Sequence, residues 1–178
     1  MTKDYTNDFT AFFSDLYRVE GAYGPKPLIP PFLAEFLGLA FKDGKPAARN
    51  ILDARVKKQG KSALAGGVAL FMASRRPYSE VVIAASDKDQ AKDRVLRAVK
   101  FACENGPLAS HAKVFRDTIE LDNRSIINAL PMDWQGAAGG NYSAVIFDEL
   151  HGYVYESQRR LFDELLPPPT QPEAVRWI

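Results

Sequence analysis

The residues best suited to chemistry in this sequence lie in one short stretch, Arg55 to Ser62, which reads Arg-Val-Lys-Lys-Gln-Gly-Lys-Ser. A β-prone apolar run, residues 48–54, precedes it, and small and apolar residues continue beyond it over 62–71 as a packed helix would. A strand, a basic loop ending in Gly-Lys-Ser and a helix together form the context in which a loop binds phosphate groups. The stretch therefore predicts a phosphate-binding loop.

Each residue of this loop has an expected role. The backbone N–H groups of such a loop point inward around phosphate oxygens, and the N-terminus of the following helix adds a partial positive charge. We expect Lys58, Gln59 and Gly60 to contribute to the cradle. Lys61 would reach the β- and γ-phosphates of a nucleotide, and the Ser62 hydroxyl would take a coordination position of Mg²⁺.

The loop departs from the common pattern at its start, because Arg55 stands where a glycine is usual. Gly-Lys-Ser also occurs by chance, and Ser62 would then only cap a helix at the end of a surface turn. A second motif is needed to decide between these interpretations.

Two adjacent carboxylates further along the chain supply that motif. The β-branched and aromatic run 145–147 predicts a buried parallel strand, and it ends in Asp148 and Glu149. Asp148 can hold Mg²⁺, usually through water, and Glu149 can polarise a water that attacks the γ-phosphate. Alternatively, both acids simply begin a polar loop. His151 is either structural or placed to sense the γ-phosphate.

Composition limits the class of protein. With 178 residues, 46% of them hydrophobic and 25% charged, the chain is expected to form one compact globular domain. A net charge of +1 predicts that any contact with nucleic acid depends on a local patch. The single cysteine, Cys103, excludes an internal disulfide framework and fits a reducing compartment. The polar N-terminus is unlike a signal peptide, and no apolar run is long enough to span a bilayer, so we expect a cytoplasmic protein without a membrane contact.

The expected elements alternate between helices and strands. Helices are predicted over 5–20, 32–41, 62–71, 90–102 and 158–166, and strands over 48–54, 80–85, 113–115, 118–121, 125–130, 145–147 and 174–178. We predict an α/β fold: a three-layer P-loop NTPase core of the ASCE/RecA-like type, with a mostly parallel sheet and helices on both faces. Residues 1–47 would form a helical segment and an adenine-side linker, and 48–178 the ATPase core. Because the chain stops within the last strand, we expect an N-terminal portion of a longer enzyme, truncated at its C-terminus.

One predicted helix has a strongly basic face. Its cations are Lys88, Lys92, Arg94, Arg97 and Lys100. Such a face is usually solvated, and the alternative is a patch that faces DNA or a neighbouring subunit.

Four stretches carry a family resemblance in combination. They are the phosphate loop with Lys57 three residues before Gly60, the strand and helix start at 84–91, residues 127–131 leading into a glycine-rich loop, and the acidic strand 144–151. Together they resemble the N-terminal ATPase portion of the large terminase subunit of tailed bacteriophages, the motor that packages DNA into procapsids. The resemblance covers residues 25–178. It departs from the family at Lys57, where arginine is preferred, in lacking a glutamine upstream between 25 and 41, and in lacking an intersubunit arginine in 136–141.

The resemblance implies Mg²⁺-dependent ATP hydrolysis that drives double-stranded DNA into procapsids in the host-cell cytoplasm. It implies that Ser62 and Asp148 hold Mg²⁺, that Glu149 activates water, and that Lys57 contacts the γ-phosphate or a neighbouring subunit. Family motors are ring homo-oligomers that work with a portal and a small terminase subunit, and a neighbouring protomer completes the transition-state charge. The isolated chain is therefore expected to hydrolyse ATP weakly or not at all.

Two other interpretations stay open on the sequence. The run Asp148-Glu149-Leu150-His151 is also found in DExH helicases, but the glycine-threonine-rich phosphate loop and the Pro-Thr-Arg-type motif of those enzymes are missing. The chain could also be a degenerate nucleotide-binding module without turnover.

Overall fold

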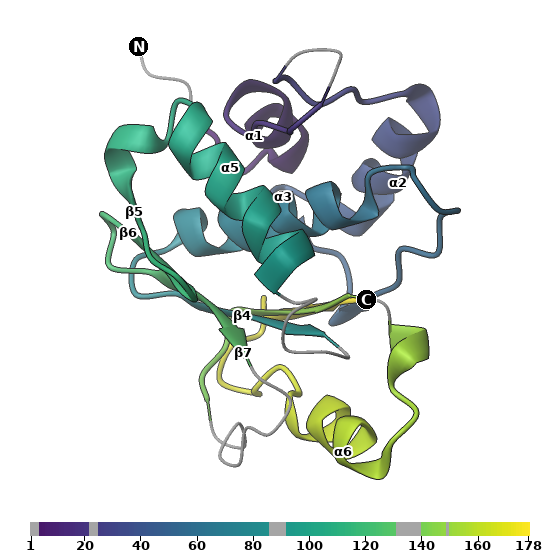
Figure 1. The fold of residues 1–178 in the computed structure, drawn as a ribbon. Coiled ribbons are helices and arrows are strands. Elements are labelled where there is room, and N and C mark those ends of the chain that lie inside the picture. The colour runs from purple at the N-terminus through teal and green to yellow at the C-terminus, as the bar shows by residue number, and fades with distance from the viewer. Residues whose placement is uncertain (1–3, 22–24, 86–91, 131–139, 149) are drawn as a thin grey trace.

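A seven-stranded sheet forms the centre of the molecule (Figure 1). The computed structural model describes residues 4–21, 25–85, 92–130, 140–148 and 150–178. The strands follow the order β3 (Asn50–Ile51), β9 (Val175–Trp177), β8 (Ala144–Asp148), β4 (Glu80–Ala85), β7 (Ile126–Leu130), β6 (Thr118–Leu121) and β5 (Ala112–Val114). Neighbours from β3 to β7 are parallel, whereas β7, β6 and β5 pair antiparallel. The prediction of a mostly parallel sheet is confirmed.

Helices cover both faces of this sheet (Figure 1). One face carries α1 (Phe9–Asp15), α2 (Pro31–Ala40), α3 (Lys61–Arg75), the π-helical turn η1 (Lys92–Leu96) and α5 (Arg97–Asn105), and the other carries α6 (Glu156–Glu164). Short 3₁₀ turns occupy η2 (Ala109–His111) and η3 (Leu150–Gly152), and a separate hairpin joins β1 (Phe41–Lys42) to β2 (Lys45–Pro46).

The central strand β4 shows why the layers form. Its side chains alternate, so that Val81 and Ile83 enter the core under α1, α3 and α5, while Val82 and Ala84 enter the core under α6. All four are fully buried. A strand that is apolar on both faces is stable only between two layers of helices, which is the arrangement of a doubly covered parallel sheet.

The first helix and the first core strand are shorter than predicted. Helix α1 begins at Phe9 because the carboxylate of Asp8 accepts a hydrogen bond from the N–H of Ala11 at 2.8 Å and caps it there. Strand β3 covers Asn50 and Ile51, which pair with Arg176 and Trp177 of β9. The other predicted elements are present within a few residues, and α5 ends at Asn105, three residues later than expected.

Aromatic residues of the N-terminal segment belong to the main core. Phe9 stacks on Phe41 with ring centroids 4.5 Å apart and meets Phe71 of α3 edge-on at 5.1 Å, and Phe41 in turn stacks on Trp177 of β9 at 6.1 Å. The N-terminal segment is therefore packed into the core through these rings. Residues on both sides of position 47 share this core. The division of the chain into two parts at residue 47 stays a prediction.

Within the described residues, no helix is both long enough and apolar enough to cross a bilayer.

Candidate functional site

The loop between β3 and α3 turns sharply just before the helix. Lys58 has φ 67° and Gly60 has φ 71°, so two backbone positions on either side of Gln59 are left-handed. This conformation carries no steric penalty for Gly60 but costs a side-chain-bearing residue such as Lys58 free energy. Left-handed turns that lead into a helix N-terminus are the backbone arrangement in which N–H groups converge on an anion.

Topology brings the acidic strand to the same edge of the sheet. Strands β3, β9, β8 and β4 are parallel, so their C-terminal ends, and the loops that follow them, lie together. Asp148 is the last residue of β8 and pairs in register with Ala85 at the end of β4. In an open parallel sheet, ligands bind at this carboxyl edge.

A cavity of about 800 Å³ opens at this edge. The predicted site residues that line it are Lys57, Lys58, Gly60, Lys61, Ser62 and Asp148. Gln59 is not part of the lining, although its carbonyl oxygen accepts a hydrogen bond from the Arg55 guanidinium. Glu149, the glycine-rich loop up to residue 139 and the predicted helix start at 86–91 lie outside the described residues, and His151 belongs to the η3 turn. The structure thus brings the two motifs together, and their contact with a ligand stays a prediction.

Cations predominate among the described residues that line the cavity. Within the described residues, the lining contains two acidic residues, Asp53 and Asp148, and four cationic ones: Lys57, Lys58, Lys61 and Arg94. Asp53 is paired with Arg55 at 2.6 Å. Such a lining attracts a polyanion and offers cations for charge-assisted hydrogen bonds to phosphate oxygens.

Arg94 is the cavity residue whose role the sequence does not indicate. It lies in the π-helical turn η1, between β4 and α5. The sequence pattern assigns it only to a helix face that is solvated or that faces DNA or a neighbouring subunit. No local signal could have placed it at the cavity, since its position depends on how η1 packs against the sheet. Short π-helical insertions occur frequently at functional sites.

A buried tyrosine lies close to Asp148. Burial raises the pKa of the Tyr153 hydroxyl, and the negative charge of Asp148 raises it further. The Tyr153 hydroxyl is buried and has no hydrogen-bond partner among the described residues. Tyr153 therefore stays protonated at neutral pH and presents a neutral hydroxyl near the end of β8.

The oxygen donors at the cavity suit a hard divalent cation. The Ser62 hydroxyl and the Asp148 carboxylate both line it, and Mg²⁺ in nucleotide sites commonly takes one or two protein oxygens together with phosphate oxygens and waters. Among the described residues, no group of three or more His, Cys, Asp or Glu side chains forms a metal site independent of a ligand. The donor set is therefore one that a bound polyphosphate would complete.

Comparison with known proteins decides the family. Residues 57–155, more than half of the chain, match the sequence model of the terminase large subunit, T4likevirus-type, N-terminal. The chain belongs to this family. The match covers the phosphate loop from Lys57 onward, the central strands and the acidic strand, and it decides against the helicase alternative.

Solved large terminases have the same fold. The large terminase of bacteriophage HK97 matches with a TM-score of 0.75 and 16% identity, over 95% of this chain and 36% of that chain. The large terminase of a thermophilic bacteriophage, solved in complex with ADP, matches with a TM-score of 0.54 and 11% identity, over 72% of this chain and 32% of that chain. This chain thus spans about a third of each terminase chain. No curated protein sequence matches it significantly.

Proposed function

We propose that this chain binds Mg²⁺-ATP in the cavity at the carboxyl edge of the sheet and hydrolyses the bond between the β- and γ-phosphates. One observation carries the proposal: the lysines of the β3–α3 loop and Asp148 at the end of β8 line a single cavity of about 800 Å³. Basic loop and acidic strand are distant in the sequence, so their meeting at one cavity is a property of the fold. The terminase family and the ADP complex of the thermophilic phage's terminase support the same conclusion.

The chain's own residues divide the work by position. Lys61, at the first turn of α3, is placed to neutralise phosphate charge, and the left-handed Gly60 orients the N–H groups before it. Ser62 and Asp148 would hold Mg²⁺, and a bound Mg²⁺ would supply positive charge against the negative charge that develops on the phosphates. Lys57 would contact the γ-phosphate or a neighbouring subunit. Glu149 follows Asp148 directly and would orient and deprotonate the attacking water.

We propose further that this hydrolysis drives double-stranded DNA into procapsids, with the chain acting in a ring of copies together with a portal and a small terminase subunit. The family supports this role. In such a ring a cation from the next protomer would supply part of the transition-state charge, an effect worth about 10³–10⁵ in rate in related phosphoryl transfers. The isolated chain is then expected to bind nucleotide and to turn it over slowly or not at all.

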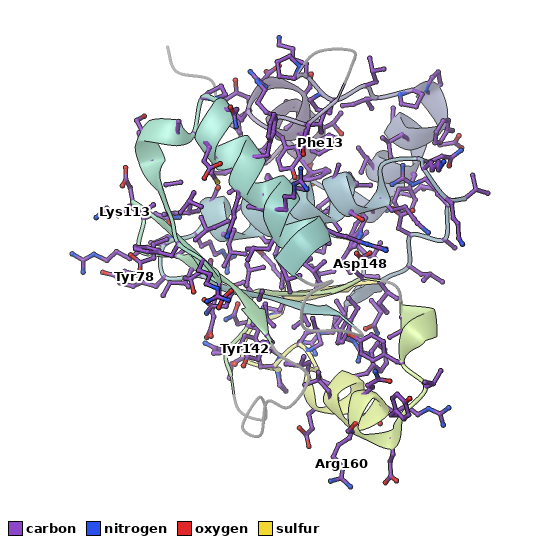
Figure 2. All side chains as sticks on the ribbon, viewed as in Figure 1. Phe13, Tyr78, Lys113, Tyr142, Asp148 and Arg160 are labelled. Atoms are coloured by element: carbon purple, nitrogen blue, oxygen red, sulfur yellow. The ribbon has the colours of Figure 1, made fainter. Side chains whose placement is uncertain are left out.

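Calorimetric titration with Mg²⁺-ATP tests the nucleotide site. Lys61→Ala is expected to abolish measurable binding, because it removes the cation at the helix N-terminus. Lys113→Ala is the matched control, since Lys113 lies in β5, the outermost strand on the side of the sheet away from β3 and the cavity (Figure 2). Glu149→Gln should bind as tightly as the native chain, because its predicted role is in the chemistry.

Three outcomes would count against the proposal. If Lys61→Ala and Lys113→Ala bind Mg²⁺-ATP with equal affinity, the nucleotide binds elsewhere. If the native chain does not bind Mg²⁺-ATP, the loop serves only as a turn that caps a helix. Tight binding with no ATP turnover at a protein concentration at which copies of the chain assemble, with DNA present, would indicate the degenerate module that binds without hydrolysis.

A further inference from the structure

Arg55 holds the two ends of the phosphate loop together. Its Nε donates to Oδ1 of Asp53 at 2.7 Å and its Nη2 donates to Oδ2 of the same carboxylate at 2.6 Å. Its Nη1 donates to the carbonyl oxygen of Gln59 at 3.0 Å. One side chain thus links the residue that enters the loop to the residue directly before Gly60, in the planar bidentate geometry that arginine makes with carboxylates.

The Asp53 end of this link is anchored in the sheet. The backbone N–H of Asp53 donates to the carbonyl oxygen of Ile178 at 2.6 Å, which extends the β3–β9 ladder by one bond. The Asp53 side chain is only 3% exposed, and that of Arg55 is 13% exposed. A rigid connection therefore runs from the sheet through Asp53 and Arg55 to the turn at Gln59.

The link also changes the charge of the cavity. Asp53 is part of the cavity lining, and a bare carboxylate there would repel phosphate groups. The bidentate pair neutralises that carboxylate, while Arg55 itself is not among the lining residues. Among the described residues of the lining, Asp148 is then the one carboxylate whose negative charge is left to offset the positive charges of the loop lysines and Arg94.

We propose that the Asp53–Arg55 pair is a positioning device for the phosphate loop. It holds the Gln59–Gly60 turn in its binding geometry before nucleotide arrives, and it removes a negative charge from beside the phosphates. The proposal rests on the nucleotide site described above. It gives a role to the arginine that replaces the usual glycine: Arg55 ties the loop to the sheet and does not touch the ligand.

Mg²⁺-ATP calorimetry on the 178-residue chain tests the pair. Arg55→Ala is expected to weaken binding by about tenfold, corresponding to about 1.4 kcal/mol, because the loop must then be ordered at the expense of binding free energy. Arg97→Ala is the matched control. Arg97 lies on α5 and donates hydrogen bonds to both carboxylate oxygens of Glu20 at 3.0 Å, and neither residue lines the cavity. It should bind as the native chain does.

A second substitution separates positioning from general stability. In the Arg55→Ala background, Asp53→Asn removes the carboxylate left unpaired beside the phosphates, so the double variant should recover about threefold of the lost affinity. Arg55→Lys keeps the charge but not the fork, and is expected to fall between the native chain and Arg55→Ala. Thermal unfolding of each variant shows that binding is measured on folded protein.

Hydrogen exchange without nucleotide tests the pair independently of the ATP site. Amides of a peptide spanning residues 54–64 should exchange faster in Arg55→Ala than in Arg97→Ala. Equal exchange in the two variants would overturn the inference even if the native chain binds ATP. Unchanged affinity in Arg55→Ala, or a double variant that binds no better than Arg55→Ala, would also overturn it. Failure of the native chain to bind, combined with faster exchange in Arg55→Ala, would refute the nucleotide site and leave the loop-holding role supported.

Discussion

Replacing Gly67 with alanine should destabilise the chain, although alanine favours a helix far more than glycine does. Gly67 lies in the middle of α3, and a Cβ there would stand 2.4 Å from Cε2 and 2.5 Å from Cδ2 of Phe13. Phe13 is buried and stacks on Tyr17 with ring centroids 5.0 Å apart and on Phe9 at 5.7 Å. Its ring has packed neighbours that limit how far it can retreat.

The magnitude follows from two opposing effects. Carbon atoms in contact prefer separations of about 3.5–4.0 Å, so the Phe13 ring must move by roughly 1 Å, and overpacking of this kind costs about 1–3 kcal/mol. Removing a glycine from a helix interior returns about 1 kcal/mol. With the clash directed at an aromatic ring inside a cluster, we expect Gly67→Ala to lower the free energy of unfolding by about 1–2 kcal/mol.

Gly38→Ala is the matched control, because Gly38 is exposed on α2 and a Cβ there meets nothing within 4 Å. It should raise the free energy of unfolding by up to about 1 kcal/mol. Urea unfolding followed by circular dichroism measures both variants against the native chain. The two midpoints should move in opposite directions, and thermal midpoints should shift by about 2–4 °C per kcal/mol. A Gly67→Ala variant as stable as Gly38→Ala would refute the packing argument.

Two further predictions concern groups outside the cavity. Burial favours a raised pKa for Glu173, but the hydrogen bond from Lys45 and the charges of Arg76 and Arg75 outweigh it and lower the pKa below its ordinary 4.5. The stabilising contribution of the Glu173 carboxylate is therefore complete above pH 4.5 and is lost as the pH falls through the lowered pKa. Glu173→Gln should flatten the acid side of a plot of melting temperature against pH. Parallel plots for the native chain and the variant would contradict this. Burial, assisted by the charge of Glu104, raises the pKa of the Cys103 thiol to about 12. Iodoacetamide at about pH 8 should therefore label Cys103 only after denaturation. Rapid labelling of the folded chain, detected by mass spectrometry, would contradict this prediction.

Local sequence patterns predict much of the fold. The three short strands predicted over 113–130 are present, because alternation and turn residues act between neighbours in the chain, and β6 pairs antiparallel with β7. The burial of Cys103 follows from helical periodicity in the same way. The start of α1 is harder to predict, since a side-chain cap from Asp8 sets it, and the extent of β3 depends on its pairing with a strand more than 120 residues away.

The sequence by itself determined the two halves of the candidate site. Gly60 and its neighbours define a turn through backbone conformations that depend on adjacent residues, and the apolar run before Asp148 defines a buried strand in the same local way. Only the tertiary structure decided that β9 lies between β3 and β8, that Arg94 reaches the cavity, and that Arg55 ties Asp53 to Gln59. The physical reason is range. Turn and strand preferences act between neighbours in the chain, whereas strand order, cavity lining and side-chain pairing depend on segments that only the packed core brings together.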